Sequence, residues 1–555
     1  MLARLLWLGF LGALGLRLLP LWELPPFSPD SWSYWELAQT VGADFYRIHT
    51  WRQFQFTEPY GVSFPPLWPL AIAATDALTG LGFRSAIALN AGIAIAIAAL
   101  LQRLGALLMC DRQRGGAFGL LVALGLVAHR SAFEELSAGR SMPLSLLLYL
   151  LLLWQLLAAA RAGAAAAAGK ATTHTNAHMC LRAAGLGATA ALATLNRFDF
   201  LPALLLLGLV VPWFLLQERG RWLAPMACWW AAAFAVLAPW IAYCLVHFGK
   251  PFASDNSRTV LAAVRLHVDD FLVLAPPTLF DAPMQWFGKT LGGMATAATS
   301  LAQPLAVNLL LLALCALLLL HWRDRRRTVA SAGPDLAALT TNPLRRAWWL
   351  ADLVVAAQLG AVLLTGFTSI RYALTLELHL LLRLAAAALG GTVLGAMAPA
   401  ATGLGTAAVS LTGRPAKLRE HATLALLAGA VALQYGLLLA PPLQRWLAPP
   451  PRVSPLHAHA PLAECLYEQV KPRVLFLTDD NTHAYRFGAL YGIETLGTPH
   501  NYRTAALDML VHRFAATHVY DELARPFEEG LARRLDATLV PICGRADLYR
   551  IAPAT

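Results

Sequence analysis

Acidic side chains beside long apolar runs are the residues of this chain best suited to chemistry. Asp30 is the sharpest case, because it lies just past the first apolar run, in the segment Ser28-Pro29-Asp30-Ser31-Trp32. An Asp carboxylate in that position can take a proton from an acceptor hydroxyl. The simpler interpretation is that Asp30 only caps the helix that follows, since Asp is a favoured N-cap residue.

Further acids and arginines occur in other segments between apolar runs. They are Glu58, the pair Glu134 and Glu135 with His129, Arg130 and Arg140 nearby, Arg197 with Asp199, Arg371 with Tyr372, and more weakly Asp255 and Arg258. Each has a simpler interpretation: a solvated loop, an ion pair bridging two short helices, or an arginine that reaches lipid headgroups. Taken together, these residues suit group transfer from a polyprenyl phosphate, because a carboxylate can serve as the base and arginines can hold the departing phosphate.

Composition determines which elements must position these residues. The chain has 555 residues, of which 58% are hydrophobic and 14% charged, and its mean hydropathy is +0.55. Soluble globular proteins are about half apolar and a quarter charged, so a soluble enzyme, a disordered chain and a fibrous chain are excluded. Long continuous Leu and Ala runs predict membrane-spanning helices, whereas a barrel would show short alternating segments.

Eleven apolar runs are close to the roughly 20 residues that a membrane-spanning helix needs. They are 4–22, 86–108, 115–131, 142–160, 183–196, 200–217, 222–247, 301–322, 347–367, 373–396 and 421–441. The stretch 183–217 is read as two short helices, because Asn196-Arg197-Phe198-Asp199 interrupts it. The first run lacks a strong basic flank and a cleavage site, so we expect a retained anchor.

Basic residues predict the orientation of these helices. Five loops that fall on one side carry 16 Lys and Arg against 5 Asp and Glu, a difference equal to the whole net charge of +11. By the positive-inside rule that side is cytoplasmic, which places the N-terminus inside and the C-terminus outside. The basic excess is therefore a topology signal and does not indicate nucleic-acid binding. Usage rich in Ala, Leu and Arg favours a bacterial inner membrane.

One further apolar segment, 66–82, would reverse every later loop if it crossed the membrane. We therefore expect it to lie on or partly within the outer leaflet. The outer side then holds the loops 23–85 and 248–300 and the segment 442–555, which follows the transmembrane catalytic domain 1–441.

The C-terminal segment predicts a small α/β domain. Its expected strands are 474–478, 517–520 and 548–551, with helical segments at about 483–490 and 504–515. Cys465 and Cys543 are the two cysteines on the outer side, and a disulfide and two free thiols are about equally expected. The chain has no CxxC, HExxH or P-loop motif.

Several segments, in order, resemble the GT-C membrane glycosyltransferases, in particular the group of dolichyl-phosphate-mannose–protein mannosyltransferases and aminoarabinose transferases in glycosyltransferase family 39. The matching segments are Asp30-Ser31-x-x-Tyr34-x-x-Leu37-Ala38, Phe64-Pro65-Pro66-Leu67-Trp68-Pro69-Leu70, Glu134-Glu135 through Leu144, Leu195-Asn196-Arg197-Phe198-Asp199, Ile370-Arg371-Tyr372-Ala373-Leu374, and the tail ending in Leu548-Tyr549-Arg550-Ile551. The chain departs from the family in having Asp-Ser where many members have Asp-Glu, and Trp68 where Tyr is common.

This resemblance implies a polytopic α-helical fold of the GT-C kind, with outer juxtamembrane helices, and an inverting sugar transfer from a polyprenyl-phosphate carrier to a protein, lipid or glycan acceptor. It implies Asp30 as the catalytic base and Arg371 as a phosphate ligand. The other residues that it implies at the substrate are Tyr34, Glu134 or Glu135, Arg140, Arg197, Asp199 and Tyr372, and Glu58 in the first outer loop is a further candidate. Members differ in metal use, so a divalent ion stays open, and no metal ligand is assigned. The sugar, the carrier length and the acceptor stay open as well.

Two other classes of function compete with this interpretation. A transporter or lipid flippase would carry ionisable residues in mid-span and paired repeats with broken helices. Asp352 is the clearest acid within a predicted span, and no repeat is visible. The third reading is a non-catalytic partner in a cell-envelope assembly, with the C-terminal domain as its binding module.

Overall fold

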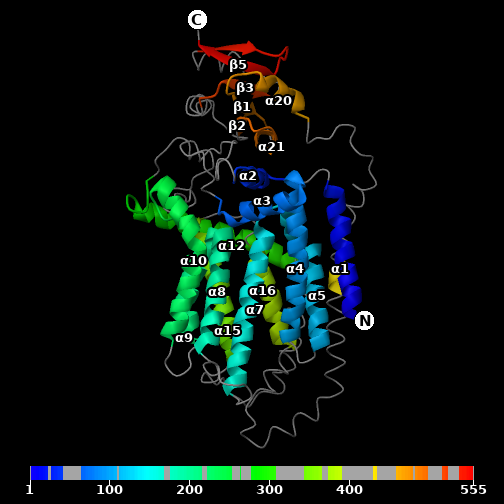
Figure 1. Ribbon diagram of the computed structural model, residues 1–555, viewed down its shortest axis with the longest axis vertical. Helices are drawn as coiled ribbons and strands as arrows, with labels where there is room; N and C mark the ends of the chain where they lie inside the picture. Colours follow the sequence, from blue (N-terminus) through cyan, green and yellow to red (C-terminus); the bar gives the residue numbers. More distant parts are fainter. Residues whose placement is uncertain are drawn as a thin grey trace, which may run out of the picture.

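The chain folds into a bundle of long apolar helices with a small sheet domain at one end (Figure 1). A computed structural model provides the coordinates. The structure describes residues 2–22, 27–41, 64–108, 112–167, 176–214, 222–252, 263, 277–307, 343–365, 373–389, 429–433, 458–478, 482–497, 515–522 and 537–553. The N-terminus lies at the end of the bundle opposite the sheet domain.

The bundle is built from the Leu- and Ala-rich runs of the sequence. Its helices are α1 (Leu2–Leu18), α4 (Ser85–Leu108), α5 (Arg112–Ala128), α7 (Met142–Ala167), α8 (Asn176–Asn196), α9 (Leu201–Phe214), α10 (Leu223–Phe248), α12 (Pro283–Val307), α15 (Pro343–Thr365) and α16 (Ala373–Leu389). Their buried side chains form one continuous apolar core. Glycines bring α4 and α5 together, since a Cβ at Gly119 would lie 2.0 Å from the Leu101 carbonyl oxygen.

Four described helices are long and apolar enough to cross a membrane: Gly82–Leu108, Met142–Ala162, Leu223–Phe248 and Arg346–Leu363. A fifth span results if α5 is joined to α6 (Arg130–Ser137), which bends away from it by 73°. All five agree with runs predicted from the sequence. The runs 301–322, 373–396 and 421–441 lie partly or mostly outside the described residues.

Two short helices lie across the end of the bundle that carries the sheet domain, α2 (Pro29–Gln39) and α3 (Leu67–Thr79) (Figure 1). With 13 residues, α3 is about 20 Å long and too short for a hydrocarbon core of about 30 Å. It ends at Gly80, whose φ of +65° suits glycine. The expectation that 66–82 does not cross the membrane is therefore consistent with the length of this helix.

The structure also resolves two uncertain boundaries. α8 ends at Asn196, and a short 3-10 turn, η3 (Phe198–Phe200), separates it from α9, as the polar interruption predicts. Residues 283–300, which the sequence places in an outer loop, form the first part of α12. The run Pro283 to Ser300 carries only one charged residue, Lys289, so helix formation there needs no charge burial beyond that side chain.

The C-terminal domain is a five-stranded sheet with helices, as predicted. Its elements are α20 (Ala460–Tyr467), β1 (Arg473–Leu477), α21 (Thr482–Tyr491), β2 (Glu494–Gly497), β3 (His518–Asp521), β4 (Ala537–Pro541) and β5 (Leu548–Pro553). The strand order is β2-β1-β3-β5-β4, with β2, β1 and β3 parallel and the remaining pairs antiparallel. β2 and β4 were not expected from the sequence, and the expected helix at 504–515 lies almost wholly outside the described residues.

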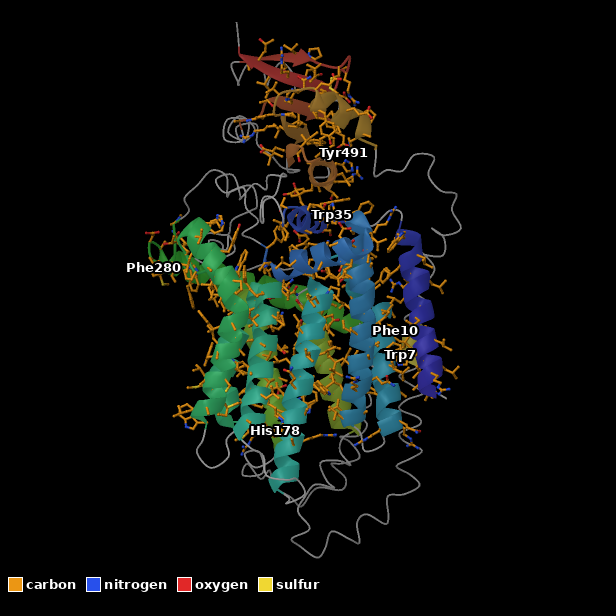
Figure 2. The ribbon with its side chains drawn as sticks, viewed as in Figure 1. Trp7, Phe10, Trp35, His178, Phe280 and Tyr491 are labelled. Carbon is orange, nitrogen blue, oxygen red and sulfur yellow. A yellow bond between two sulfur atoms is a disulfide. The ribbon has the colours of Figure 1, made fainter. Side chains whose placement is uncertain are left out.

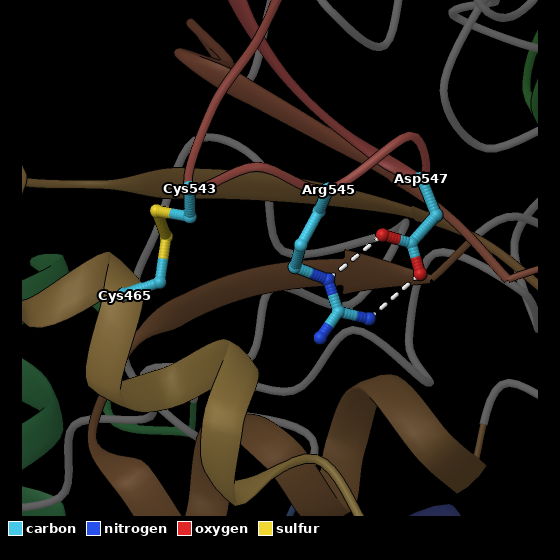
Figure 3. The surroundings of a disulfide bond; sticks show 4 residues. All are labelled: Cys465, Cys543, Arg545 and Asp547. Atoms are coloured by element: carbon cyan, nitrogen blue, oxygen red, sulfur yellow. Dashed lines mark hydrogen bonds and ion pairs between the residues drawn. A yellow bond between two sulfur atoms is a disulfide. The ribbon is translucent and has the colours of Figure 1, made fainter.

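A disulfide joins α20 to the turn before β5. Cys465 and Cys543 are bonded, with their Cα atoms 6.2 Å apart (Figure 3). The structure thereby decides between the two interpretations that the sequence left open. Arg545 and Asp547 form an ion pair in the same turn.

The C-terminal domain meets the bundle through α21, which packs against α2. Figure 2 labels Trp35 of α2 and Tyr491 of α21 on the two sides of this junction. Tyr485, Ala489 and Leu490 of α21 pack against the apolar core of the bundle. The helix that carries Asp30 therefore lies between the bundle and the C-terminal domain.

Candidate active site

Ser28, and not Asp30, caps the helix α2. The Ser28 Oγ accepts from the backbone N–H of Ser31 at 3.4 Å, and the Ser31 Oγ accepts from the Ser28 N–H at 3.1 Å. Pro29 takes the first helical position, where its missing N–H costs nothing. The expectation that Asp30 is the N-cap is thus wrong. Asp30 instead lies half-buried in the first turn, where the helix dipole favours its ionised form.

Arg140 connects the start of α2 to α6. Its Nε donates to the Ser28 Oγ at 3.0 Å, and its Nη1 donates to a Glu135 carboxylate oxygen. The Glu135 side chain is 5% exposed. Glu134, in contrast, is 56% exposed and pairs with Arg130 along the outer face of α6. The two adjacent acids therefore differ in role, and Glu135 is the one that faces inward.

The turn between α6 and α7 is fixed from three sides. Trp68 of α3 donates its indole N–H to the Gly139 carbonyl at 3.0 Å. Asn90 of α4 donates to the carbonyls of Leu136 and Arg140. Tyr34 of α2 shares a 3.2 Å hydrogen bond with the Ser141 hydroxyl. These buried contacts hold Arg140 in place beside α2.

The break between α8 and α9 lies beside the same turn. Asn196, at the end of α8, donates to the Ser141 carbonyl at 3.0 Å and to the Ser145 hydroxyl at 2.7 Å. The next residue, Arg197, forms a two-pronged ion pair with Asp199 at 3.0 to 3.3 Å. Both side chains are nearly buried, and Gln358 of α15 also donates to Asp199. This is the ion pair between two short helices that the sequence offered as the simpler interpretation.

Two charged residues that the sequence analysis did not single out hold α6 from its other side. Glu377 of α16 is 2% exposed, and its carboxylate lies 3.4 Å from His129, which caps α6. Arg17 of α1 is 5% exposed, donates to the Val127 carbonyl and lies 3.6 Å over the Phe133 ring. In the sequence, Glu377 and Arg17 stand out only as charged residues within apolar runs, and such residues mark functional and structural sites alike.

A polar network lies deeper, among α7, α15 and α16. His379 bonds Tyr149 at 2.5 Å through one ring nitrogen and Asp352 at 2.7 Å through the other. Arg383 completes the network at 3.2 Å from Asp352. The in-span acid Asp352, which could have indicated a transporter, is thus compensated by a cation and a histidine.

The structure therefore brings Asp30, Tyr34, Glu135 and Arg140 around one turn, with the Arg197–Asp199 pair beside it. Glu134 faces away from this group. Glu58, Asp255, Arg258, Arg371 and Tyr372 lie outside the described residues. Among the residues that the structure describes, the acids of this site form no group of three metal donors. We derive no step through a metal.

No family model and no curated protein sequence matches this chain. Solved structures do match it. ArnT from Cupriavidus metallidurans, bound to undecaprenyl phosphate, is similar with a TM-score of 0.54 and 11% identity over 98% of this chain and 97% of that protein. The chain has the GT-C fold.

Two archaeal structures agree with this fold. The Archaeoglobus fulgidus oligosaccharyltransferase in complex with Zn and sulfate has a TM-score of 0.54 at 12% identity, over 99% of this chain and 72% of that one. The oligosaccharyltransferase AglB from the same organism, with an inhibitory peptide and a dolichol-phosphate, has a TM-score of 0.52 at 12% identity, over 93% and 69%. At such identities the likeness establishes the fold alone, which is a polytopic helical membrane fold.

Proposed function

We propose that this protein is a membrane glycosyltransferase that moves a sugar from a polyprenyl-phosphate carrier to an acceptor hydroxyl at the outer membrane face. The observation that carries the proposal is the half-buried Asp30 in the first turn of a helix that Ser28 caps and Arg140 clamps. The GT-C fold supports it, since ArnT has been solved with undecaprenyl phosphate and AglB with a dolichol-phosphate.

The reaction is a single displacement. The acceptor hydroxyl oxygen forms a bond to the anomeric carbon while the bond from that carbon to the phosphate oxygen breaks. The electron pair leaves with the phosphate, and the hydroxyl proton passes to the Asp30 carboxylate. The products are the glycosylated acceptor and the polyprenyl phosphate, and the configuration at the anomeric carbon is inverted.

The other site residues divide into two roles in this proposal. Arg371 binds the donor phosphate, as the family resemblance implies, and Tyr372 and Glu58 contact the substrate. Arg140 and Glu135 hold the helix of Asp30, and Tyr34 fixes its next turn through Ser141. Arg197 and Asp199 hold the α8–α9 break beside this helix. Glu134 has no role at the substrate in this proposal.

The position of the catalytic site predicts the surroundings of the protein. The helix α2, which carries Asp30, α3 and the disulfide-containing domain all lie at the end of the bundle opposite the N-terminus. A disulfide persists in oxidising compartments, which supports a periplasmic location for this end and a cytoplasmic N-terminus in a bacterial inner membrane.

The test compares Asp30→Asn with Glu134→Gln in the full-length protein purified in detergent. Release of polyprenyl phosphate and formation of the glycosylated acceptor are measured with a panel of polyprenyl-phosphate sugars. We expect Asp30→Asn to lose at least about 100-fold in kcat, the range that general-base catalysis supplies, and Glu134→Gln to keep the wild-type rate. Transfer at the wild-type rate in Asp30→Asn would show that Asp30 is not the base.

The competing function is transport or lipid flipping. It predicts movement of a solute or lipid across liposomes that contain the purified protein, with no sugar transferred. The network at Asp352 is a weak basis for transport, because His379 and Arg383 compensate the charge of this in-span acid.

A further inference from the structure

A group of side chains of the kinds that bind metals lies in the C-terminal domain, and the proposed transfer uses none of them. His459 precedes α20, His483 lies in the first turn of α21, and Glu522 directly follows β3. One donor atom from each lies within 4.8 Å of the others. Three separate segments of the chain thus converge on one point.

The distances within this group suit a shared cation. His483 Nδ1 lies 2.7 and 2.9 Å from the two Glu522 oxygens, and His459 Nε2 lies 3.3 Å from one of them. Ligands at about 2.0 to 2.2 Å from one tetrahedral zinc ion lie about 3.3 to 3.6 Å apart, so the His483 and Glu522 side chains must rotate slightly apart to admit the ion. Two imidazoles and one carboxylate are the donor set of many zinc sites with an open fourth position.

The place of the group in the sheet is a second, independent indication. β1 connects through α21 to β2 on one side, whereas β3 lies on the other side of β1. The strand order therefore reverses between β1 and β3, and α/β sheets bind ligands beyond the carboxyl ends of strands at such a point. Thr478 follows β1 and Glu522 follows β3, so the group lies at this reversal.

The surroundings orient each donor. His459 is 8% exposed, and its ring packs edge-on against Phe476, Phe487 and Tyr520. The Thr478 hydroxyl donates to the second Glu522 oxygen at 2.5 Å, as outer partners of zinc ligands commonly do. Burial alone would raise the pKa of Glu522, but hydrogen bonds from the two histidines and Thr478 outweigh it and hold that pKa well below its usual range.

One cation opposes metal binding. The Arg486 Nη2 lies 3.5 Å from His459 Nδ1. When Nε2 binds a metal, the neutral ring carries its proton on Nδ1, which then cannot accept from an arginine. Arg486 must move away from His459 in the metal-bound state, and its removal should favour binding.

We propose that His459, His483 and Glu522 form a zinc site with a fourth position open to water or to an oxygen of a ligand. The bound ion would tie the first turn of α21 to β3 and α20. Because α21 packs on the helix of Asp30, the site would stiffen the contact between the C-terminal domain and the bundle. This proposal does not depend on the glycosyltransferase assignment.

The test measures Zn²⁺ binding to the full-length protein in detergent, by competition with a chelator of known affinity and by the shift in melting temperature. We expect wild type to bind one zinc ion. His483→Gln and the double variant His459→Gln/His483→Gln should each bind it about 100-fold or more weakly. Glu464→Gln, an exposed acid of α20, should bind as wild type does. Thr478→Val should weaken binding by about 10-fold, and Arg486→Gln should strengthen it.

His483 is half-buried, so His483→Gln is the variant least prone to unfold, and its melting curve without zinc serves as the fold control. Zinc should raise the melting temperature of wild type and Glu464→Gln, and leave that of His483→Gln unchanged. Equal zinc content and equal shifts in wild type and the double variant would refute the site. Loss of zinc by Glu464→Gln as complete as that by His483→Gln would refute it as well.

Discussion

Arg140 donates a 3.0 Å hydrogen bond to the hydroxyl of Ser28, the residue that caps the helix of Asp30. The same guanidinium pairs with the buried Glu135, so α6 and α2 are joined through one side chain. The position of the proposed base therefore depends on residues more than 100 positions away in the sequence.

Replacement of Arg140 by Gln should lower both stability and transfer. It leaves the Glu135 carboxylate buried without its cation, which costs about 3 kcal/mol. The double variant Arg140→Gln/Glu135→Gln should recover most of the stability but not the rate, because the hydrogen bond to Ser28 stays weakened. Arg130→Gln, which breaks the exposed pair with Glu134, is the matched control and should change stability by less than about 1 kcal/mol. Melting temperature and kcat are the measurements.

Replacement of Ser28 by Ala should destabilise the protein by about 1 kcal/mol, since an N-cap is lost together with the acceptor for Arg140. Ser28→Asn keeps a capping oxygen and should restore most of the stability. Under the proposed function, kcat should fall in Ser28→Ala with KM nearly unchanged, because Asp30 shifts and the donor contacts do not. Unchanged kcat in Ser28→Ala would argue against positioning of Asp30 through its cap.

Replacement of both Cys465 and Cys543 by Ser should destabilise the C-terminal domain by about 2 to 4 kcal/mol, since the bond closes a loop with a sequence separation of 78. Denaturant unfolding with and without reductant measures the effect, and reductant should not affect the double variant. Cys180→Ser is the control, because Cys180 is free in the structure. In cells, a membrane-impermeant thiol reagent should label the two cysteines only after reduction. Equal labelling before reduction would contradict the disulfide.

Acidification should weaken the C-terminal domain through His518. Burial, together with the charge of Arg550 on the facing strand, lowers the pKa of His518 from 6.5 to about 4. The folded state binds this proton less readily than the unfolded state does. The contribution of neutral His518 to the stability of the folded domain is therefore complete above about pH 6.5 and is lost as the pH falls toward 4. The slope of melting temperature against pH over this range should be smaller in His518→Gln than in wild type. An equal slope in both proteins would exclude His518 as its source.

Much of the bundle follows from the sequence, because apolar runs of about 20 residues leave few alternatives in a membrane. The spans at 86–108 and 142–160 and the break at Asn196 agree with the structure. The short strands β2 and β4 could not be predicted, since four or five residues without clear alternation give no periodic signal. Their pairing depends on neighbours that only the folded sheet supplies.

The sequence by itself determined a helical membrane protein with a C-terminal α/β domain, and it selected Asp30, because hydrophobicity and charge are local properties. Only the tertiary structure decided that Ser28 caps α2, that Glu135 and not Glu134 faces inward, and that Cys465 bonds Cys543. It alone brought His459, His483 and Glu522 together, since their wide spacing matches no local motif. These relationships join distant segments, and the packing of helices and strands sets their distances.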